Sequence, residues 1–227
     1  GTIQPDEGSY ETNNSTVNIN LSGVDSVLNG NIYDYNYDDN GSGTIETSGT
    51  NISFLNGATW NVTGDSTAKE VTVDNAQINL NADKEQKVNI TTLNGIDSNI
   101  TVNDLTKDQI TIGTNNSTGL QVIGTSNATK RFNSSDLAGS MQQLVDTVGI
   151  GTGNQLDSAL AQESDILPEI TALVDDNGNV IINSIRTKGH VANEGITELA
   201  NVAFMAWRAE NDEMHQRMGE LRSSNGE

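Results

Sequence analysis

The stretch ISFLNGATWNVTGDSTAKEVTVDNAQINL, residues 52–80, decides the fold of this 227-residue chain. Apolar side chains stand at alternate positions in short groups, such as Ile52 with Phe54 and Ile78 with Leu80. A period of two places each group on one face of a β-strand. The residues between the groups are the Asn, Gly, Asp and Ser of tight turns. The stretch therefore predicts short strands joined by polar corners.

The same pattern extends from about residue 17 to residue 124, without a helical period between the groups. The inward-facing groups are Val17/Ile19/Leu21, Ile52/Phe54, Trp60/Val62, Val71/Val73, Ile78/Leu80, Val88/Ile90, Ile100/Val102, Ile110/Ile112 and Leu120/Val122. Two all-β architectures fit: an antiparallel sandwich, or a right-handed parallel β-helix in which three short strands complete each coil. We favour the parallel β-helix solenoid because hairpin turn sequences are few in this region.

The composition favours a long, thin molecule with a narrow core. Aromatic residues are 4% of the chain, and the formal net charge is −20 with 11 basic residues. So few basic residues disfavour nucleic acid as a partner. Cysteine is absent, which excludes thiolate zinc sites and suits a protein that is exported through an oxidising periplasm.

We expect no catalytic residue, no metal and no cofactor. The two histidines, His190 and His215, lie near or within the C-terminal helix predicted below, where a catalytic cleft is not expected. A calcium-loop spacing of acidic and amide residues begins at Asp34, but Asp39 and Ile45 stand where the loop requires glycine and an acid. A solvated turn is the better interpretation. Trp60 is interpreted as a packing residue of a coil rather than as a platform for sugar stacking.

The pattern changes after residue 133. Leu137, Met141, Leu144, Val145 and Val148 have helical spacing after a capping region at residues 134–136, and a second short helix is expected after Asn154. A β-hairpin follows: Ile170, Ala172 and Val174 alternate, an Asn177-Gly178 turn comes next, and Val180 and Ile182 alternate back. These helices and the hairpin would cap the end of the solenoid.

Residues 193–222 predict a long helix. Ile196, Leu199, Ala203 and Trp207 form one helical stripe, while the second half of the segment is strongly charged. Such a helix would be roughly 40 Å long, comparable with a bilayer, but its charges exclude lipid contact. The pattern alone also fits an amphipathic helix that lies on a domain or pairs with a second copy of the chain.

Two parts of the sequence resemble bacterial autotransporters (type V secretion). The C-terminal segment FMAWRAENDEMHQRMGELRSSNGE is similar to the linker that precedes the outer-membrane β-barrel, and Arg217, Met218, Gly219, Glu220, Leu221 and Arg222 match its motif. The stretch from residue 52 to residue 80 resembles a recurring coil of autotransporter passengers. Its matching residues are Leu55, Asn56, Gly57, Ala58, Trp60, Val62, Gly64, Asp65 and Ser66, followed by Asn75, Ala76, Ile78 and Leu80.

The resemblance implies a structural and secretion module of a surface adhesin at the outer membrane. It divides the chain into N-terminal coils or a loop (1–43), β-helix coils (44–132), an autochaperone-like cap (133–188) and the linker helix (189–227). Its partners would be the chain's own β-barrel and surface ligands, and the passenger would be a monomer that stays attached, because Asp212 and Glu213 replace the asparagine pair of the self-cleaving members. The alternatives are a β-helix carbohydrate-active enzyme and a trimeric fibre or phage tail module, which would use the last helix as a coiled coil.

Overall fold

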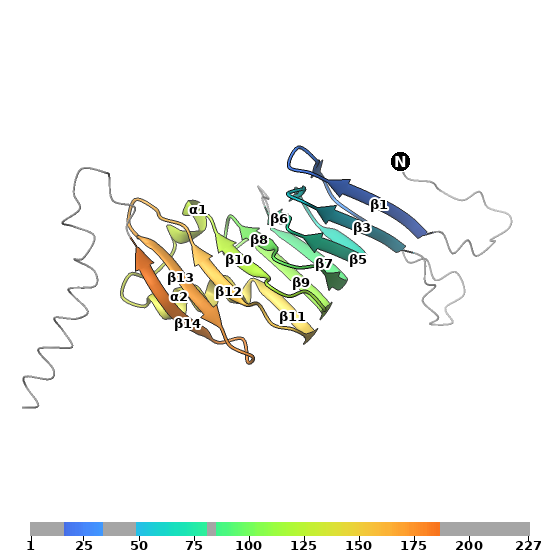
Figure 1. Cartoon of the computed structure of the whole chain (residues 1–227). Helices are drawn as coiled ribbons and strands as arrows, with labels where there is room; N and C mark the ends of the chain where they lie inside the picture. The colour runs from blue at the N-terminus through green and yellow to red at the C-terminus, as the bar shows by residue number, and fades with distance from the viewer. Residues whose placement is uncertain (1–15, 34–48, 81–84, 187–227) are drawn as a thin grey trace, which may run out of the picture.

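The computed structural model describes residues 16–33, 49–80 and 85–186, and the fold of these residues is mainly β. The strands form two sheets that share one hydrophobic core (Figure 1). Sheet A contains β1 (Thr16–Ser22), β3 (Gly49–Leu55), β5 (Ser66–Asp74), β7 (Gln86–Asn94), β9 (Asp108–Asn115) and β11 (Val148–Gly153). Sheet B contains β2 (Val27–Asn29), β4 (Thr59–Val62), β6 (Gln77–Leu80), β8 (Asn99–Val102), β10 (Gln121–Gly124), β12 (Ser158–Ala161), β13 (Glu169–Val174) and β14 (Val180–Arg186). The helices are α1 (Ser126–Thr129) and α2 (Leu137–Asp146).

As far as β12, the chain alternates between the two sheets, so that each new strand pairs in parallel with the strand two before it. In sheet B, Ile78 pairs with Ile100, and Ile100 pairs with Val122. The paired positions are therefore 22 residues apart in these turns of the chain. The strands from β1 to β12 are all parallel, so the antiparallel sandwich is wrong for them, and neither sheet closes on itself.

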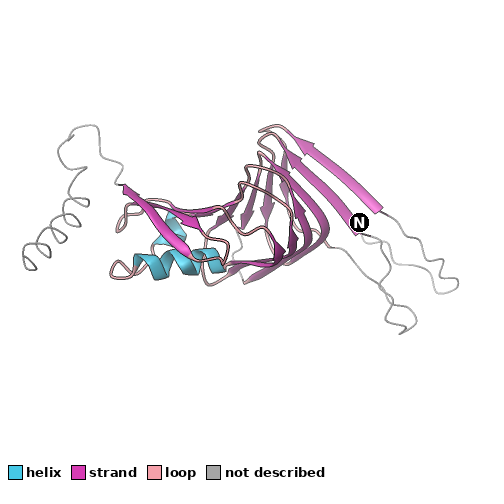
Figure 2. Ribbon diagram, turned by 60° about the horizontal axis from the view of Figure 1, so that its bottom comes forward, coloured by secondary structure: helices cyan, strands magenta, loops and turns pink. Residues whose placement is uncertain are grey.

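The long strands of sheet A change their inward face part-way along. In β5, Ala68 and Val71 are both buried, and two residues, Lys69 and Glu70, separate them where one would keep the alternation. β7 and β9 repeat this two-residue step, at Thr91–Thr92 and at Gly113–Thr114. The step turns each long strand around the common interior, and the strands curve accordingly in Figure 2. Residues on both sides of the step in each long strand are thereby buried in the shared core.

One corner of the stack is built from left-handed residues. Asn56, Asn75, Asp97 and Gly119 have φ of 54°, 46°, 49° and 69°, and they lie between consecutive strands of sheet A and sheet B. The backbone N–H groups of Asn56, Asn75 and Asp97 donate to carbonyl groups of the next turn, over 2.9–3.0 Å. Asn, Asp and Gly tolerate this conformation better than other residues. The chain therefore uses the same chemistry at this corner in four successive turns, from β3–β4 to β9–β10.

The interior columns become smaller toward the C-terminal end of the stack. The inward column of sheet B that holds Leu80 and Val102 continues with Gly124 and Ala161. Leu144 of α2 fills the space, because a Cβ on Gly124 would stand 3.1 Å from its side chain. Sheet A ends at β11, and α2 supplies the second layer beneath the end of sheet B. The expected helix of residues 137–148 is confirmed from Leu137 to Asp146, with Asp136 as its N-cap.

Two expectations for this region are wrong. The expected second helix after Asn154 is the strand β12, because Ala159 and Ala161 are needed on the buried face beside β10. Val148 also leaves the helical stripe and begins β11, where it pairs with Ile110. The hairpin is confirmed as β13 and β14, which pair antiparallel across the Asn177-Gly178 turn.

Gly95→Ala tests the backbone packing of the corner. Gly95 has φ of 129°, and a Cβ there would overlap the carbonyl oxygen of Val73 in the neighbouring turn. We expect the free energy of unfolding in urea to fall by at least about 2 kcal/mol, because the left-handed φ and the overlap both oppose alanine. Gly23→Ala is the control: its φ is 98°, but a Cβ there meets nothing within 4 Å. Equal losses in the two variants would contradict a close approach at Gly95.

Candidate functional site

The predicted coil motif forms the corner between β3 and β4. Leu55 accepts hydrogen bonds from Gly23 N and Ala58 N with its carbonyl oxygen, and Asn56 Nδ2 donates to Ser22 Oγ over 3.0 Å. Gly57 has φ of 91°, and its N–H donates to the carbonyl oxygen of Asn75 over 2.6 Å. Ala58 is fully buried. These residues hold adjacent turns of the chain together.

The second half of the motif fills the core and the next corner. Trp60 and Val62 are fully buried, and the Trp60 indole donates to the carbonyl oxygen of Gly30 over 2.9 Å. Its ring stacks on Phe54, with centroids 5.9 Å apart. Asp65 Oδ1 accepts from Lys87 N over 2.7 Å, and the buried Ser66 Oγ accepts from Ile32 N. The interpretation of Trp60 as a packing residue is therefore confirmed.

Several predicted residues lie outside the described part of the chain. They are the linker motif (Arg217, Gly219, Leu221 and Arg222), the two histidines and the polar loop from Asp34. Within the described residues, no three His, Asp or Glu side chains come together as a metal site would require. No described helix is long and apolar enough to cross a bilayer.

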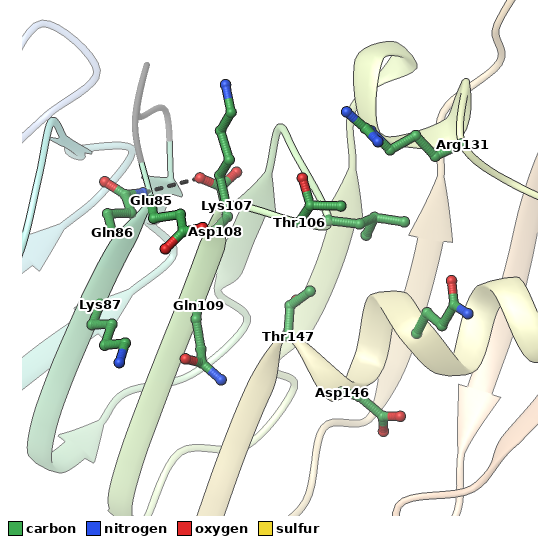
Figure 3. A pocket seen from close by; sticks show the side chains of 12 residues that line it. Glu85, Gln86, Lys87, Thr106, Lys107, Asp108, Gln109, Arg131, Asp146 and Thr147 are labelled. Carbon is green, nitrogen blue, oxygen red and sulfur yellow. Dashed lines mark hydrogen bonds between the residues drawn. The ribbon is translucent and has the colours of Figure 1, made fainter.

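A polar hollow lies at the corner where sheet B returns to sheet A. It is a groove of about 560 Å³ between the starts of β7 and β9, the loop after α1 and the C-terminal end of α2. Glu85, Lys87, Gln109, Arg131 and Asp146 border it (Figure 3). Three of its side chains are basic and three are acidic, so it suits a polar ligand without a strong preference for either sign of charge.

Asp108 lies at the base of the groove and binds the residues around it. Its side chain is buried, and Oδ2 accepts from the backbone N–H groups of Asn103 and Asp104 over 2.7 and 2.8 Å. Gln86 Nε2 donates to Asp108 Oδ1 over 3.2 Å, the contact drawn in Figure 3. Gln86 Oε1 is buried and has no hydrogen-bond partner in the described ranges. A water or a ligand donor would satisfy that acceptor.

Asp104 ties the groove to the segment after α1. Its carboxylate lies 3.8 Å from Lys107 Nζ and 3.7 Å from Arg131 Nε. Burial raises the pKa of Asp104, but hydrogen bonds from the Thr106 hydroxyl and amide, together with the two cations, outweigh burial and lower it. The carboxylate is therefore charged at neutral pH, and it links two turns of the chain.

Sequence reasoning missed this groove. Asp108 starts a strand, and its role depends on Gln86 in one neighbouring turn and on its own preceding loop. The usable pattern is an acid four residues after the Asn-Asp pair, Asn103-Asp104, which resembles a turn cap. That pattern is too common to identify a groove.

A second polar centre fixes the hairpin to α2. Gln142 Nε2 donates to the carbonyl oxygen of Gly178 over 3.0 Å, and Gln142 Oε1 accepts from Val180 N over 3.0 Å. Within the turn, Asp175 Oδ1 accepts from the N–H groups of Asn177 and Asn179 over 2.9 and 2.8 Å. One glutamine and one aspartate thus set the position of the hairpin.

Comparisons with known proteins identify no relative. No protein family model, no curated protein and no solved structure matches the chain.

The Asp175 turn predicts an acid-sensitive hairpin. Hydrogen bonds from the backbone and then the side chain of Asn179 lower the pKa of Asp175, and the backbone of Asn177 adds to this. Since the folded pKa lies below the value of about 3.9 in an unfolded chain, this stabilisation is present above that pH and is lost as the pH falls through the folded pKa. We expect amide exchange protection of Asn177 and Asn179 to fall in that window. Asp175→Asn should reduce their protection at pH 7, and Asp176→Asn, at an exposed neighbouring carboxylate, should leave it unchanged.

Asp108→Ala tests the base of the groove. It removes the acceptor of two backbone N–H groups and of Gln86, so we expect a loss of about 1–3 kcal/mol in the free energy of unfolding. Gln109→Ala, at the exposed next residue, should change it by less than about 0.5 kcal/mol. An unchanged urea midpoint for Asp108→Ala would show that water replaces the carboxylate without cost.

Proposed function

We propose that this chain is part of the surface-exposed passenger of an autotransporter, where it serves as a structural and secretion module, and that its strands form a right-handed parallel β-helix. The in-register parallel stacking supports the proposal: Trp60, Ile78, Ile100 and Val122 form one continuous inward column. The two-residue step in β5, β7 and β9 supports it as well, because a strand that changes its inward face would form two of the three walls of a β-helix coil. A solenoid of this kind grows by adding coils, each of which contacts only its neighbours.

The two ends of the stack differ, and the difference supports a role in folding. At the β1 end, Ile19 is 38% exposed, whereas its register partner Ile52 is 1% exposed. A further coil of the same kind would bury Ile19. At the other end, the antiparallel hairpin and α2 finish the stack. A closed end that folds first would act as the template onto which earlier coils stack.

The sequence supports two further parts of the proposal, that the whole protein is an adhesin and that the C-terminal segment tethers it to the outer membrane. Residues 189–227, with the motif of Arg217, Gly219, Leu221 and Arg222, would lead into an outer-membrane β-barrel, and the chain's negative charge suits exposure at the cell surface. The free energy of coil stacking would then oppose return of the passenger through the barrel.

Surface display in the diderm bacterium that encodes the chain tests the proposal. Antibodies against residues 49–186 should label intact cells, and external protease should remove that labelling without cell lysis. Labelling that appears only after lysis would refute a surface passenger.

A matched pair of variants in α2 of the full-length protein tests the role of the closed end. Leu144→Asp places a charge in the core and should reduce surface labelling at least about five-fold, because a buried unpaired charge costs several kcal/mol. Gln143→Asp adds the same charge at an exposed position of the same helix and should leave labelling unchanged. Equal surface labelling in the two variants would contradict a folding role for this end.

A further inference from the structure

The outer face of sheet B is polar along most of its length. Asn61 Nδ2 donates to Asn29 Oδ1 over 2.7 Å, and Asn79 Nδ2 donates to Asn61 Oδ1 over 2.8 Å. In the parallel column, Gln77 Nε2 donates to Thr59 Oγ1, and Gln121 Nε2 donates to Ser158 Oγ. These amide and hydroxyl ladders need no partner other than water.

The same face becomes apolar at the C-terminal end of the sheet. Four aliphatic side chains, Ile123 of β10, Leu160 of β12, Leu173 of β13 and Ile181 of β14, point outward, and we call them the outer patch. Ile123 pairs with Leu160, and Leu173 pairs with Ile181. Leu173 and Ile181 are 53% and 55% exposed. The outer patch therefore crosses four adjacent strands obliquely.

The outer patch cannot be a displaced part of the core. The inward positions of the same strands hold Val122, Ala159, Ala172 and Ile182, and that face is already covered from within. Single exposed aliphatic residues are ordinary, but adjacent ones on neighbouring strands usually mark a contact surface. An antiparallel sheet with a solvated face would normally carry polar residues there.

We propose that the segment 196–207 of this chain docks on the outer patch as an amphipathic helix. Its stripe of Ile196, Leu199, Ala203 and Trp207 has the spacing of one helical face and needs an apolar surface to cover it. The stripe would be about 17 Å long, and four strands span about 15 Å. Docking buries both apolar surfaces together.

The position of the segment in the chain favours it over a separate partner. It follows β14, which ends at Arg186 and carries Ile181 of the outer patch. Nine residues separate Arg186 from Ile196, enough chain to reverse direction over about 30 Å. A tethered segment also has a high effective concentration at the patch, unlike a second copy. The docking does not depend on the chain being part of an autotransporter. It is tested by fluorescence and crosslinking, whereas the proposed function is tested by surface labelling of cells.

Tryptophan fluorescence of the whole chain tests the docking. The chain has two tryptophans, and Trp60 is fully buried, so quenching by acrylamide reports mainly on Trp207. We expect blue-shifted emission and weak quenching in the wild type. Leu173→Glu and Ile181→Glu should each shift the emission to the red and increase the quenching constant at least two-fold. Val24→Glu, which changes a 75% exposed valine far from the outer patch, is the control and should leave both unchanged.

A pair of introduced cysteines distinguishes docking of the chain's own segment from docking of a second copy of the chain. The chain has no native cysteine, so Ile181→Cys with Ala203→Cys should form an intramolecular disulfide that runs as a monomer on a non-reducing gel. A crosslinked dimer, with light scattering that shows a dimer which Leu173→Glu dissociates, would replace our proposal with self-association. Strong quenching of wild-type Trp207 that neither glutamate variant changes would overturn it as well.

Discussion

Register between neighbouring turns of the chain is the constraint on which this structure depends. A parallel strand that slipped by one residue would turn its whole apolar set outward. The pairing of Ile78 with Ile100 and then with Val122 keeps the interior column continuous. Asn75 and Asp97, whose backbones are left-handed, hold the column at its start, because each lies two residues before a strand of sheet B, β6 or β8. Core packing and backbone hydrogen bonding therefore specify the same alignment.

The same constraint explains how the stack ends. Interior columns that continued with Leu and Val would need another parallel turn above them. Gly124, Ala159 and Ala161 instead leave space that Leu144 and the rest of the buried face of α2 occupy. The antiparallel β13 then prevents a further parallel strand from pairing with β12. A helix and a reversed strand thus change the packing from sheet against sheet to sheet against helix, without exposing the core.

The sequence predicted the parts of the fold that depend on local patterns. Alternation at Ile78 and Leu80 located a strand, Asp136 and Leu137 located the start of a helix, and Asn177-Gly178 located a hairpin. The sequence predicts a helix at β12 because Ala159 and Ala161 favour helices locally. In the structure these alanines lie in a strand, and their small side chains leave room for α2, which packs against this end of sheet B. The groove at Asp108 is not predicted by the sequence for a related reason. It joins residues from different turns of the chain, and no local pattern indicates which turns become neighbours.

The two corners of each turn are under different demands. The corner at Asn56, Asn75 and Asp97 has a left-handed residue in each of these turns, and it is two to four residues long. The opposite corner, from sheet B back to sheet A, is short between β4 and β5 but holds both helices between β10 and β11. The spacing of paired residues grows there from 22 to 38 without loss of register. One edge of the molecule is thus a fixed spine, and the other can accept inserted loops of different lengths, which makes it the natural place for evolution, or for an engineer, to add new binding chemistry.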